Sequence, residues 1–294
     1  MTKSAVISVC GRANVGKSTL MNRLVGEKIS IVSDKPQTTR TRITGVVTRG
    51  DTQFVLLDTP GFHKPKNKLG NYMMEVINNT VFDADCVLLL VEPVASIGPQ
   101  EEELISRIKS SGLPCILVIN KIDTVEKDRV LEVIGSYSRR FRFYAVVPIS
   151  AERSDGLEIL MEELEKFAVE GPHFFPDDMI TDQPERQICA EIVREKMLNC
   201  LDKEIPHGTA VEISSFTELE NGSVELEAVI YCEKASHKGI IIGKNGNMLK
   251  KIGSLARTDM EELLGCKVML RTWVKVKENW RNSDLMLSNF GFKE

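Results

Sequence analysis

A glycine-rich motif near the N-terminus constrains this chain more than any other feature. Residues 11–18 read Gly-Arg-Ala-Asn-Val-Gly-Lys-Ser and match the pattern G-x-x-x-x-G-K-[ST]. A strand-like apolar segment (Ala5–Cys10) precedes the motif, and a helix-like segment (about Thr19–Val25) follows it. Glycines let backbone N–H groups approach phosphates closely, and the helix N-terminus adds positive potential. The motif predicts a P-loop in which Lys17 reaches the β- and γ-phosphates, the Ser18 hydroxyl binds Mg²⁺, and Lys17 faces solvent when no ligand is bound.

Strand-like and helix-like segments alternate along the chain after the P-loop. A hairpin turn is predicted at Arg49-Gly50-Asp51, and later apolar runs are typical of buried strands. The strand candidates are Ile43–Thr48, Gln53–Leu57, Cys86–Val91, Cys115–Ile119 and Ala145–Ile149, and the helix candidates are Gln100–Ser110, Glu126–Arg140 and Leu157–Ala168. This alternation, together with the P-loop, predicts an α/β domain with a mostly parallel sheet and helices on both faces.

The alternation ends at residues 171–178, a segment with proline and glycine and no periodicity, where we expect a domain boundary. Beyond it the predicted order is α+β. The expected elements are a helix at Glu185–Leu201, strands at Ala210–Phe216 and Ser223–Cys232 joined by a turn at Asn221-Gly222, two helices around Lys244 and a strand at Lys267–Val276. We therefore predict a first domain at 1–171, a linker at 172–182 and a second domain at 183–294.

Charge and cysteine content bear on the partners and the location of the chain. The net charge of −4 argues against a general nucleic-acid binder, but residues 234–281 carry eleven Lys or Arg against four Asp or Glu. Such a basic segment on an acidic protein can hold a polyanion at one site. The seven cysteines form no Cys-x-x-Cys pair, and Cys10, Cys86 and Cys115 lie in strand-like runs, so we expect reduced core thiols in a cytosolic protein. No signal peptide and no membrane span are expected.

A second motif, Asn120-Lys121-Ile122-Asp123, predicts guanine as the base. It follows the strand candidate Cys115–Ile119, at the carboxyl end where ligands bind in open α/β sheets. The Asp123 carboxylate can accept hydrogen bonds from N1–H and the 2-amino group of guanine, a donor pair that adenine lacks, and Lys121 can lie along the base plane. Ser150-Ala151 ends a fifth strand and would close over the guanine, although these two residues alone equally suit a helix N-cap.

Two further segments are expected at the γ-phosphate and its metal ion. Asp58-Thr59-Pro60-Gly61 ends a strand, so Asp58 would hold Mg²⁺ through water and the Gly61 N–H would sense the γ-phosphate. In the loop Pro36–Arg40, Thr39 is favoured over Thr38 as a hydroxyl ligand of Mg²⁺, with a plain polar surface loop as the alternative. The expected metal ligands are Ser18, Thr39 and Asp58, and the expected catalytic residues are Lys17, Thr39 and Gly61. The expected nucleotide-binding set is Gly11, Arg12, Ala13, Asn14, Val15, Gly16, Lys17, Ser18, Thr19, Asp58, Thr59, Pro60, Gly61, Phe62, Asn120, Lys121, Asp123, Ser150 and Ala151.

The four motifs, in the chain order Gly11–Ser18, Thr39, Asp58–Gly61 and Asn120–Asp123, resemble those of translation-factor-class small GTPases. The P-loop sequence Gly-Arg-x-Asn-Val-Gly-Lys-Ser narrows the resemblance to the branch of GTPases that includes Era. That branch commonly has proline at the position where this chain has Ala13. Many GTPases place a glutamine after the Asp-x-x-Gly motif to orient the attacking water. Phe62 occupies that place here, a hydrophobic replacement that the Era-like branch shares. The resemblance further implies that Asn14 helps to hold K⁺, while a cap on the loop backbone is an equally good interpretation of Asn14.

The basic segment contains the loop Gly243-Lys244-Asn245-Gly246 between two helical stretches. A G-x-x-G loop lets the protein backbone approach a nucleic-acid backbone while its lysine neutralises phosphate. The pattern alone also describes ordinary turns, but the helix order and the local charge favour RNA binding. Ile240–Ile242 would supply an apolar floor beside the bases, and Arg257 continues the cationic helix. The expected RNA-binding residues are Lys238, Ile242, Gly243, Lys244, Asn245, Gly246, Lys250 and Lys251.

This second region resembles a KH domain. The strings Ile180-Thr181-Asp182, Ile192-Val193-Arg194-Glu195-Lys196 and Trp273-Val274-Lys275-Val276-Lys277 look like the Era family specifically, and together with the first domain the resemblance covers nearly the whole chain. Trp273 and Trp280 could stack on bases, although packing in the core is favoured for Trp273.

The resemblance implies a GTPase that binds GTP and GDP with Mg²⁺, hydrolyses GTP to GDP and phosphate, and binds 16S ribosomal RNA near its single-stranded 3′ end during small-subunit assembly. It also implies loose peripheral association with the inner face of the cell membrane. We expect a cytoplasmic monomer. One alternative is a signalling or trafficking GTPase whose C-terminal domain binds protein, which the basic segment and its G-x-x-G loop disfavour. Another is a GTP-dependent scaffold without hydrolysis, which Phe62 would permit.

Overall fold

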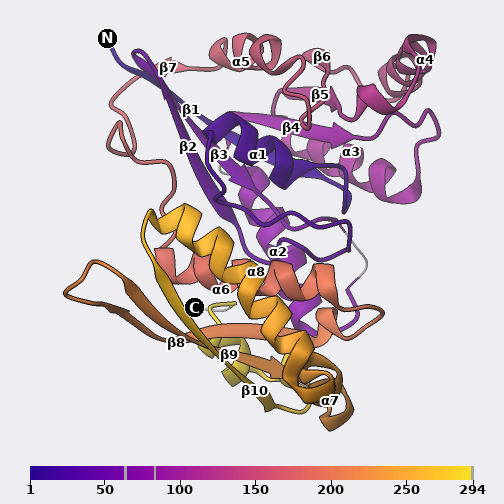
Figure 1. The fold of residues 1–294 in the computed structure, drawn as a ribbon. Coiled ribbons are helices and arrows are strands. Elements are labelled where there is room, and N and C mark those ends of the chain that lie inside the picture. Colours follow the sequence, from indigo (N-terminus) through magenta and orange to yellow (C-terminus); the bar gives the residue numbers. More distant parts are fainter. Residues whose placement is uncertain (63–64, 83, 293–294) are drawn as a thin grey trace. The chain divides into compact units, whose positions relative to one another are not determined.

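The computed structural model describes residues 1–62, 65–82 and 84–292, and its internal contacts divide the chain into two units (Figure 1). Unit 1 comprises residues 1–30, 39–64 and 73–182, and unit 2 comprises residues 31–38, 65–72 and 183–294. The C-terminal part of unit 2 thus begins at Gln183. Two short segments from the first part of the chain also belong to unit 2, and one of them, residues 31–38, lies directly before Thr39.

The main strands of unit 1 form one sheet, and its central strands are continuous apolar runs, as expected where both faces are covered. Every residue of β4 and β5 is buried. The strand order is β2-β3-β1-β4-β5-β6, with β2 antiparallel to β3, the other neighbours parallel, and β7 antiparallel beside the start of β1. The strands are β1 (Lys3–Gly11), β2 (Ile43–Arg49), β3 (Thr52–Asp58), β4 (Cys86–Val91), β5 (Cys115–Ile119), β6 (Ala145–Pro148) and β7 (Val169–Glu170). The predicted mostly parallel sheet is confirmed.

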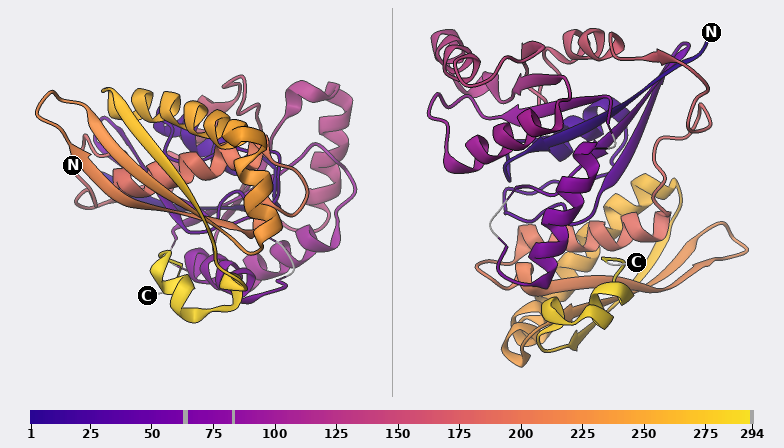
Figure 2. Two further views of the ribbon diagram at one scale, coloured as in Figure 1. Left: turned by 60° about the horizontal axis from the view of Figure 1, so that its bottom comes forward. Right: turned by 180° about the vertical axis from the view of Figure 1, so that it is seen from behind.

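Helices cover both faces of this sheet (Figures 1 and 2). One face packs on α1 and α5, and the other packs on α2, α3 and α4. The helices are α1 (Lys17–Val25), α2 (Lys68–Phe82), α3 (Pro99–Ser111), α4 (Lys127–Ser138) and α5 (Leu157–Glu165). Helix α2 escaped the sequence prediction because its segment contains a glycine and three asparagines, which are weak helix formers, and lacks acidic residues in its first turn.

The cysteines of unit 1 support the sheet rather than a reactive site. Cys10, Cys86 and Cys115 are buried free thiols, as expected from their place in apolar strands. Burial raises the pKa of Cys10 and of Cys86 to about 12, so both stay protonated at neutral pH and are poor nucleophiles.

The segment predicted as a linker, 172–182, is hydrogen-bonded along unit 1 rather than being a free tether. The Ser4 hydroxyl donates to Pro172 O (3.0 Å), and the Thr181 hydroxyl donates to Thr44 O (2.7 Å). Between them, the Gln53 amide exchanges two hydrogen bonds with the backbone of Phe175, at 2.9 and 3.0 Å. These side-chain contacts join residues more than 100 positions apart, so a local pattern of proline and glycine does not reveal them.

Unit 2 contains a three-stranded sheet with the order β10-β9-β8, in which β9 is antiparallel to β8 and parallel to β10. Helices α6 and α8 share one hydrophobic core with the sheet. The elements are α6 (Glu185–Cys200), β8 (Thr209–Glu218), β9 (Val224–Cys232), α7 (Ala235–Ile242), α8 (Asn247–Leu264), β10 (Val268–Val276) and α9 (Asp284–Asn289). This is the predicted α+β order of a KH-type domain. In the described ranges of both units, no helix has the length and apolar character needed to cross a bilayer.

The structure contradicts two expectations about the tryptophans of unit 2, namely that Trp280 could stack on a base and that Trp273 packs in the core. Trp280 is fully buried; its Nε1 donates to Gly208 O (2.9 Å) and its ring packs on Phe290 and Phe292. Trp273 is 55% exposed, so the expectation that it packs in the core is wrong. Strand alternation places Trp273 on the face of β10 opposite the buried Val274. Figure 2 shows α9 on the side of the sheet away from α6 and α8.

Candidate nucleotide site and candidate RNA-binding surface

The P-loop connects β1 to α1 and closes around the side chain of Lys17. The Lys17 Nζ donates to the backbone oxygens of Gly11 (3.1 Å) and Arg12 (2.8 Å), and the residue is only 6% exposed. Burial lowers the pKa of Lys17, and the negative charge of Asp58 opposes this effect. The expectation that Lys17 faces solvent without a ligand is wrong, because the loop carbonyls replace the hydrogen bonds of water.

The three predicted metal ligands meet beside Lys17. The Ser18 Oγ lies 3.0 Å from Thr39 Oγ1 and 3.0 Å from Asp58 Oδ2. Asp58 is fully buried, and burial raises its pKa to about 6, although Lys17 and three hydroxyl groups favour the ionised form. The sequence placed these side chains on a helix, a loop and a strand end, and the fold brings them into one cluster.

This cluster fits a small divalent cation. In the described part of the chain, Asp58 Oδ1 is buried and has no hydrogen-bond partner. An unpaired buried carboxylate oxygen is costly unless water or a metal ion satisfies it. Mg²⁺ prefers oxygen ligands and retains several water molecules, which suits two hydroxyl groups and a carboxylate that acts through water. Ser18, Thr39 and Asp58 could therefore hold Mg²⁺.

The neighbouring threonine, Thr38, has different partners and lies in unit 2. Its hydroxyl donates to Lys35 O (2.6 Å), and its backbone oxygen accepts a hydrogen bond from Arg194 of α6. Arg194 is buried and also donates to Gln37 O (3.3 Å), while Glu195 accepts from Val32 N (2.9 Å). Segment 31–38 is thus fixed to α6 up to the residue before Thr39, which explains why the two threonines differ.

Two polar residues that motif reasoning missed hold the loop after α1. The Asn22 side chain donates to Ser30 O (2.7 Å) and accepts from the backbone N–H groups of Ile29 (3.1 Å) and Ser30 (2.9 Å). The Ser30 hydroxyl in turn lies 3.4 Å from Asp58 Oδ2. Asn22 is four residues after Ser18, on the same face of α1, and this spacing is the signal that could have revealed it.

The loop after β3 lies directly against the P-loop. A Cβ atom on Gly61 would lie 2.8 Å from Ala13 Cα, so any larger residue would separate the two loops. Phe62 N donates to Gly11 O (3.2 Å), and the Phe62 ring is buried in the core. Phe62 therefore acts as an apolar anchor for the loop and has no group that could orient a water molecule.

Asn120 joins the P-loop to the predicted guanine loops. It is 2% exposed; its Nδ2 donates to Val15 O (2.8 Å), and its Oδ1 accepts from Ala151 N (2.9 Å). Neither hydrogen bond requires a ligand. The asparagine of this motif thus connects two loops of the site, a role that the sequence pattern alone did not reveal.

The remaining residues of the guanine motif lie beside these loops. A hydrogen bond from the Ser150 hydroxyl, with a smaller contribution from Arg153, lowers the pKa of Asp123 and keeps it ionised. The Lys121 Nζ donates to Asn14 O (2.7 Å) and pairs with Glu92 (2.5 Å). An ionised carboxylate and a lysine stem that crosses the P-loop are the groups that guanine recognition needs.

The other predicted nucleotide residues surround this cluster. Val15 and Pro60 are buried, Asn14 is exposed with a left-handed backbone (φ 66°), and the Thr59 hydroxyl donates to Val9 O (3.0 Å). Thr19 is half-buried in the first turn of α1. The fold therefore gathers residues from the four motifs around the P-loop.

The G-x-x-G loop forms a tight connection between α7 and α8. Gly243 has φ 72°, a conformation that favours glycine, and a Cβ atom there would lie 2.7 Å from Met248 Cβ. Asn245 also has a left-handed backbone (φ 53°), which asparagine and aspartate tolerate. The side chains of Lys244 and Asn245 are exposed, so the loop presents its backbone and one cation to solvent.

The other predicted RNA-binding residues divide into two groups. Lys238, Lys250 and Lys251 are exposed, while Ile242 is partly buried against the core. Ile241 is fully buried in that core, so the expected apolar floor of Ile240–Ile242 is wrong at its central residue. A helix presents three consecutive residues in different directions, and only Ile240 of the three is exposed.

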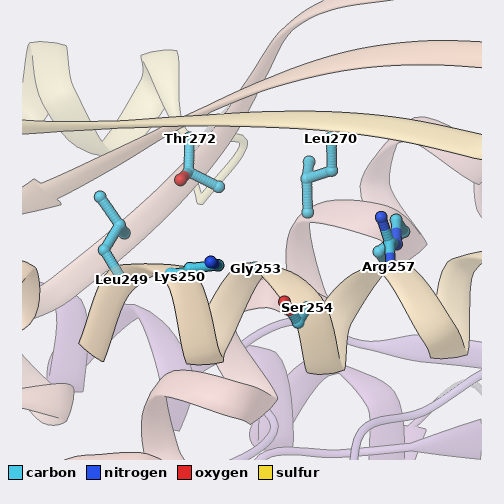
Figure 3. Close-up of a pocket in the computed structure, with 7 residues that line it drawn as sticks. All are labelled: Leu249, Lys250, Gly253, Ser254, Arg257, Leu270 and Thr272. Carbon is cyan, nitrogen blue, oxygen red and sulfur yellow. The ribbon is translucent and has the colours of Figure 1, made fainter. Parts of the chain in front are cut away.

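Helix α8 and strand β10 line a cavity of about 160 Å³ (Figure 3). Its lining residues are Leu249, Lys250, Gly253, Ser254, Arg257, Leu270 and Thr272. Gly253 lies among the lining residues of α8, and a Cβ atom there would be at ordinary van der Waals distance, 3.8 Å, from Thr272 Cγ2. Lys250 and Arg257 stand on the helix side, opposite Leu270 and Thr272 (Figure 3). Leu270 and Thr272 were missed because the sequence does not show which strand faces α8.

Known protein families match both parts of the chain. The family described as "50S ribosome-binding GTPase" matches residues 6–121, and the family described as "KH domain" matches residues 204–281. GTPase Era of Ruminiclostridium cellulolyticum is 53% identical over 291 residues, which cover 99% of this chain and 98% of the relative. GTPase Era of Clostridioides difficile is 50% identical over 296 residues and is matched along 100% of both chains.

Solved structures match the chain from end to end. A crystal structure of Era in complex with MgGDPNP and nucleotides 1506–1542 of 16S ribosomal RNA has a TM-score of 0.96 and 37% identity, with 100% of both chains covered. A structure of an Aquifex aeolicus Era variant bound to GDP·AlF4⁻ has a TM-score of 0.95 and 37% identity, again with 100% of both chains covered.

Proposed function

The chain belongs to the Era family of GTPases, and from this premise we propose that GTP binding and hydrolysis control its binding to the 3′-terminal part of 16S ribosomal RNA during small-subunit assembly. The observation that carries the proposal is the full-length match to a relative that holds both MgGDPNP and nucleotides 1506–1542 of 16S ribosomal RNA. The matched regions include the motif cluster around Lys17 and the G-x-x-G loop with its groove.

The α8–β10 groove suits a single RNA strand. Its volume of about 160 Å³, its apolar side chains at Leu249 and Leu270 and the hydroxyl group at Thr272 suit a splayed base. Lys250 and Arg257 are positioned to neutralise phosphates beside it. The G-x-x-G backbone at the start of α8 adds N–H groups that can approach the RNA backbone.

In GTP hydrolysis, water attacks the γ-phosphorus and the bond to the β-phosphate oxygen breaks. Mg²⁺, held by Ser18, Thr39 and Asp58, would neutralise charge on the phosphates. Lys17 would neutralise charge on the β- and γ-phosphates, and the Gly61 N–H would donate to the γ-phosphate. Since Phe62 offers no hydrogen bond to water, catalysis relies on the positions of these groups.

The fixed segment before Thr39 supports a link between nucleotide state and RNA binding. Segment 31–38 is hydrogen-bonded to α6, the first helix of the KH domain, and ends one residue before the hydroxyl that would bind Mg²⁺. A change at Thr39 on hydrolysis would therefore be transmitted to the α6 contacts. This is how one bound γ-phosphate can alter a domain that it does not touch.

Potassium is part of the same proposal. Asn14 is an exposed P-loop residue with a left-handed backbone, and the family resemblance implies that it helps to hold a monovalent cation. Hydrolysis is then expected to be faster in K⁺ than in Na⁺, and Asn14→Ala should remove the difference. Equal rates in the two salts for the unmodified protein would leave Asn14 as a cap on the loop backbone.

Crosslinking to cellular RNA tests the proposed partner. The full chain is crosslinked in cells, and the bound fragments are sequenced. Reads are expected to concentrate at the 3′ end of 16S ribosomal RNA, and Lys244→Asp with Asn245→Asp should remove them. Reads spread over many messenger RNAs, or a protein partner recovered equally with and without RNase, would contradict the proposal and favour a signalling or trafficking role.

We also propose a cytoplasmic location with weak peripheral association at the membrane. This part rests only on the family resemblance, and fractionation of cells at low and high salt would test it. Recovery of the chain in the soluble fraction at all salt concentrations would contradict membrane association.

A further inference from the structure

Helix α3 carries two side chains that contact residues of the nucleotide site. The Arg12 Nη1 donates to Glu101 Oε1 at 2.7 Å, and Arg12 is the second residue of the P-loop. The Arg107 guanidinium lies 5.3 Å from the centre of the Phe62 ring, and Phe62 directly follows Gly61. One rigid helix is thus connected to both loops that are expected at the phosphates.

The backbone of Arg12 is connected to the same loops. Its carbonyl oxygen accepts a hydrogen bond from Lys17 Nζ at 2.8 Å. Arg12 and Phe62 also form an isolated parallel bridge between the P-loop and the loop after β3. A displacement of Arg12 would therefore move the hydrogen-bond acceptor of Lys17 and the backbone next to Gly61.

The ion pair between Arg12 and Glu101 is poorly suited to a purely stabilising role. The Glu101 side chain is only 10% exposed, and its Oε2 has no hydrogen-bond partner in the described part of the chain. Gly98 makes room for this carboxylate, since a Cβ atom there would lie 2.8 Å from Oε2. The Arg12 side chain is 38% exposed, so the pair joins a buried carboxylate to a partly hydrated guanidinium, and lost hydration of the carboxylate offsets much of the attraction. The main physical effect of this pair is to determine where Arg12 lies.

We propose that Glu101 and Arg12 are positioning residues for GTP hydrolysis. By joining the P-loop to α3, they hold Lys17 at a set separation from the Gly61 N–H, which α3 supports through Arg107 and Phe62. Small displacements of such groups lower rates strongly while ground-state binding changes little. The effect is expected to be large in this chain because no glutamine at position 62 orients the attacking water.

A double substitution that removes both charges tests the proposal. In the full chain, Arg12→Met with Glu101→Leu leaves no unpaired buried charge, so the midpoint of thermal unfolding should stay close to that of the unmodified protein. The expected result is a kcat for GTP hydrolysis at least about tenfold lower, with GDP affinity within about twofold. Glu101→Gln, which keeps the shape and one acceptor oxygen, should retain most of the rate.

The same helix provides a matched control. Arg140 pairs with Glu102 of α3 at 3.2 Å, and both side chains are exposed. Arg140→Met with Glu102→Leu should leave kcat unchanged. A kcat within about twofold of normal for the Arg12 and Glu101 double variant would overturn the proposal. So would a loss of GDP affinity equal to the loss of kcat, since the pair would then only hold the P-loop together. Neither result depends on RNA, so the proposed ribosomal role is tested separately.

Discussion

The P-loop and the G-x-x-G loop each place a lysine beside closely spaced glycines, but the two lysines have opposite environments. Lys17 is buried and bonded to two loop carbonyls, and Asp58, Thr39 and Asn120 around it are also buried. Lys244 is exposed, as are Lys250 and Lys251 on the following helix. Both loops are suited to bind phosphate. The P-loop would do so with a lysine that is already buried and hydrogen-bonded, and the G-x-x-G loop with a lysine that is exposed on the surface.

This difference in burial determines whether a substitution can change ligand binding at a site without changing the stability of the fold. A buried polar group that loses its partner costs free energy whether or not a ligand is present. An exposed lysine loses only its long-range attraction for phosphate when it is replaced. Removal of a buried group that leaves its partner in the nucleotide site unpaired should therefore alter stability and binding together, while changes at the G-x-x-G loop should alter binding alone.

The largest effect is expected for Lys17→Ala. Nucleotide affinity should fall at least about 100-fold, since the cation at the β- and γ-phosphates is lost. The carbonyls of Gly11 and Arg12 also lose their donor, at a cost of about 1–3 kcal/mol, so the thermal midpoint should fall. Fluorescent-nucleotide binding and thermal unfolding measure the two effects, with the exposed Lys109→Ala as control. Normal phosphate release by the Lys17 variant would remove the P-loop assignment.

A somewhat smaller effect is expected for Asp123→Asn. The amide places a donor where guanine also has donors, so GTP affinity should fall about 100-fold while the fold is retained. Competition between GTP and ATP measures the loss of base preference, and Asp128→Asn on the exposed start of α4 is the control. If the unmodified protein bound ATP and GTP equally, guanine recognition by this motif would be excluded.

The RNA loop should respond without a change in stability. Lys244→Asp with Asn245→Asp reverses the local charge, so RNA affinity at moderate salt should fall at least about tenfold. The log–log salt slope should become shallower by about 0.7 for every phosphate that the loop no longer neutralises. Aspartate tolerates the left-handed backbone at position 245, so the thermal midpoint and GTP affinity should barely change.

The matched control for this variant changes the same residue types elsewhere in unit 2. Lys203 and Asn221 are exposed, and Lys203→Asp with Asn221→Asp introduces the same change in charge. RNA binding should be nearly normal in the control. Survival of RNA binding in the loop variant would make the loop an ordinary turn, and loss of folding together with RNA binding would give the loop a structural role.

The smallest effect is expected for the pH dependence of nucleotide binding, which can be measured without any mutation. Burial raises the pKa of Asp58 to about 6, so protonation should weaken Mg²⁺-dependent GTP binding about tenfold for each pH unit below 6. Because the folded-state pKa lies above the ordinary value of 3.8, protonation favours the ligand-free fold, and this stabilisation is lost as the pH rises through 6. Titration of Mg²⁺ between pH 5 and 8 measures the effect. A pH-independent Mg²⁺ requirement would contradict it.

The sequence by itself determined the fold class of both units and most members of the nucleotide site. Continuous apolar runs such as Cys86–Val91 identify doubly covered strands, and the P-loop and Asn120–Asp123 motifs have spacings that local backbone geometry imposes. These signals are local, so they survive without knowledge of the tertiary structure. Helix α2 lacked such a signal and was missed.

Only the tertiary structure decided which residues meet from distant parts of the chain. Lys17 is buried against the P-loop carbonyls, and Asn120 connects two loops of the site. Trp273 is exposed while Trp280 is buried, and Arg12 pairs with Glu101. Each outcome depends on which faces of which elements pack together. Burial and long-range pairing are properties of that packing, and a residue's neighbours along the chain do not determine them.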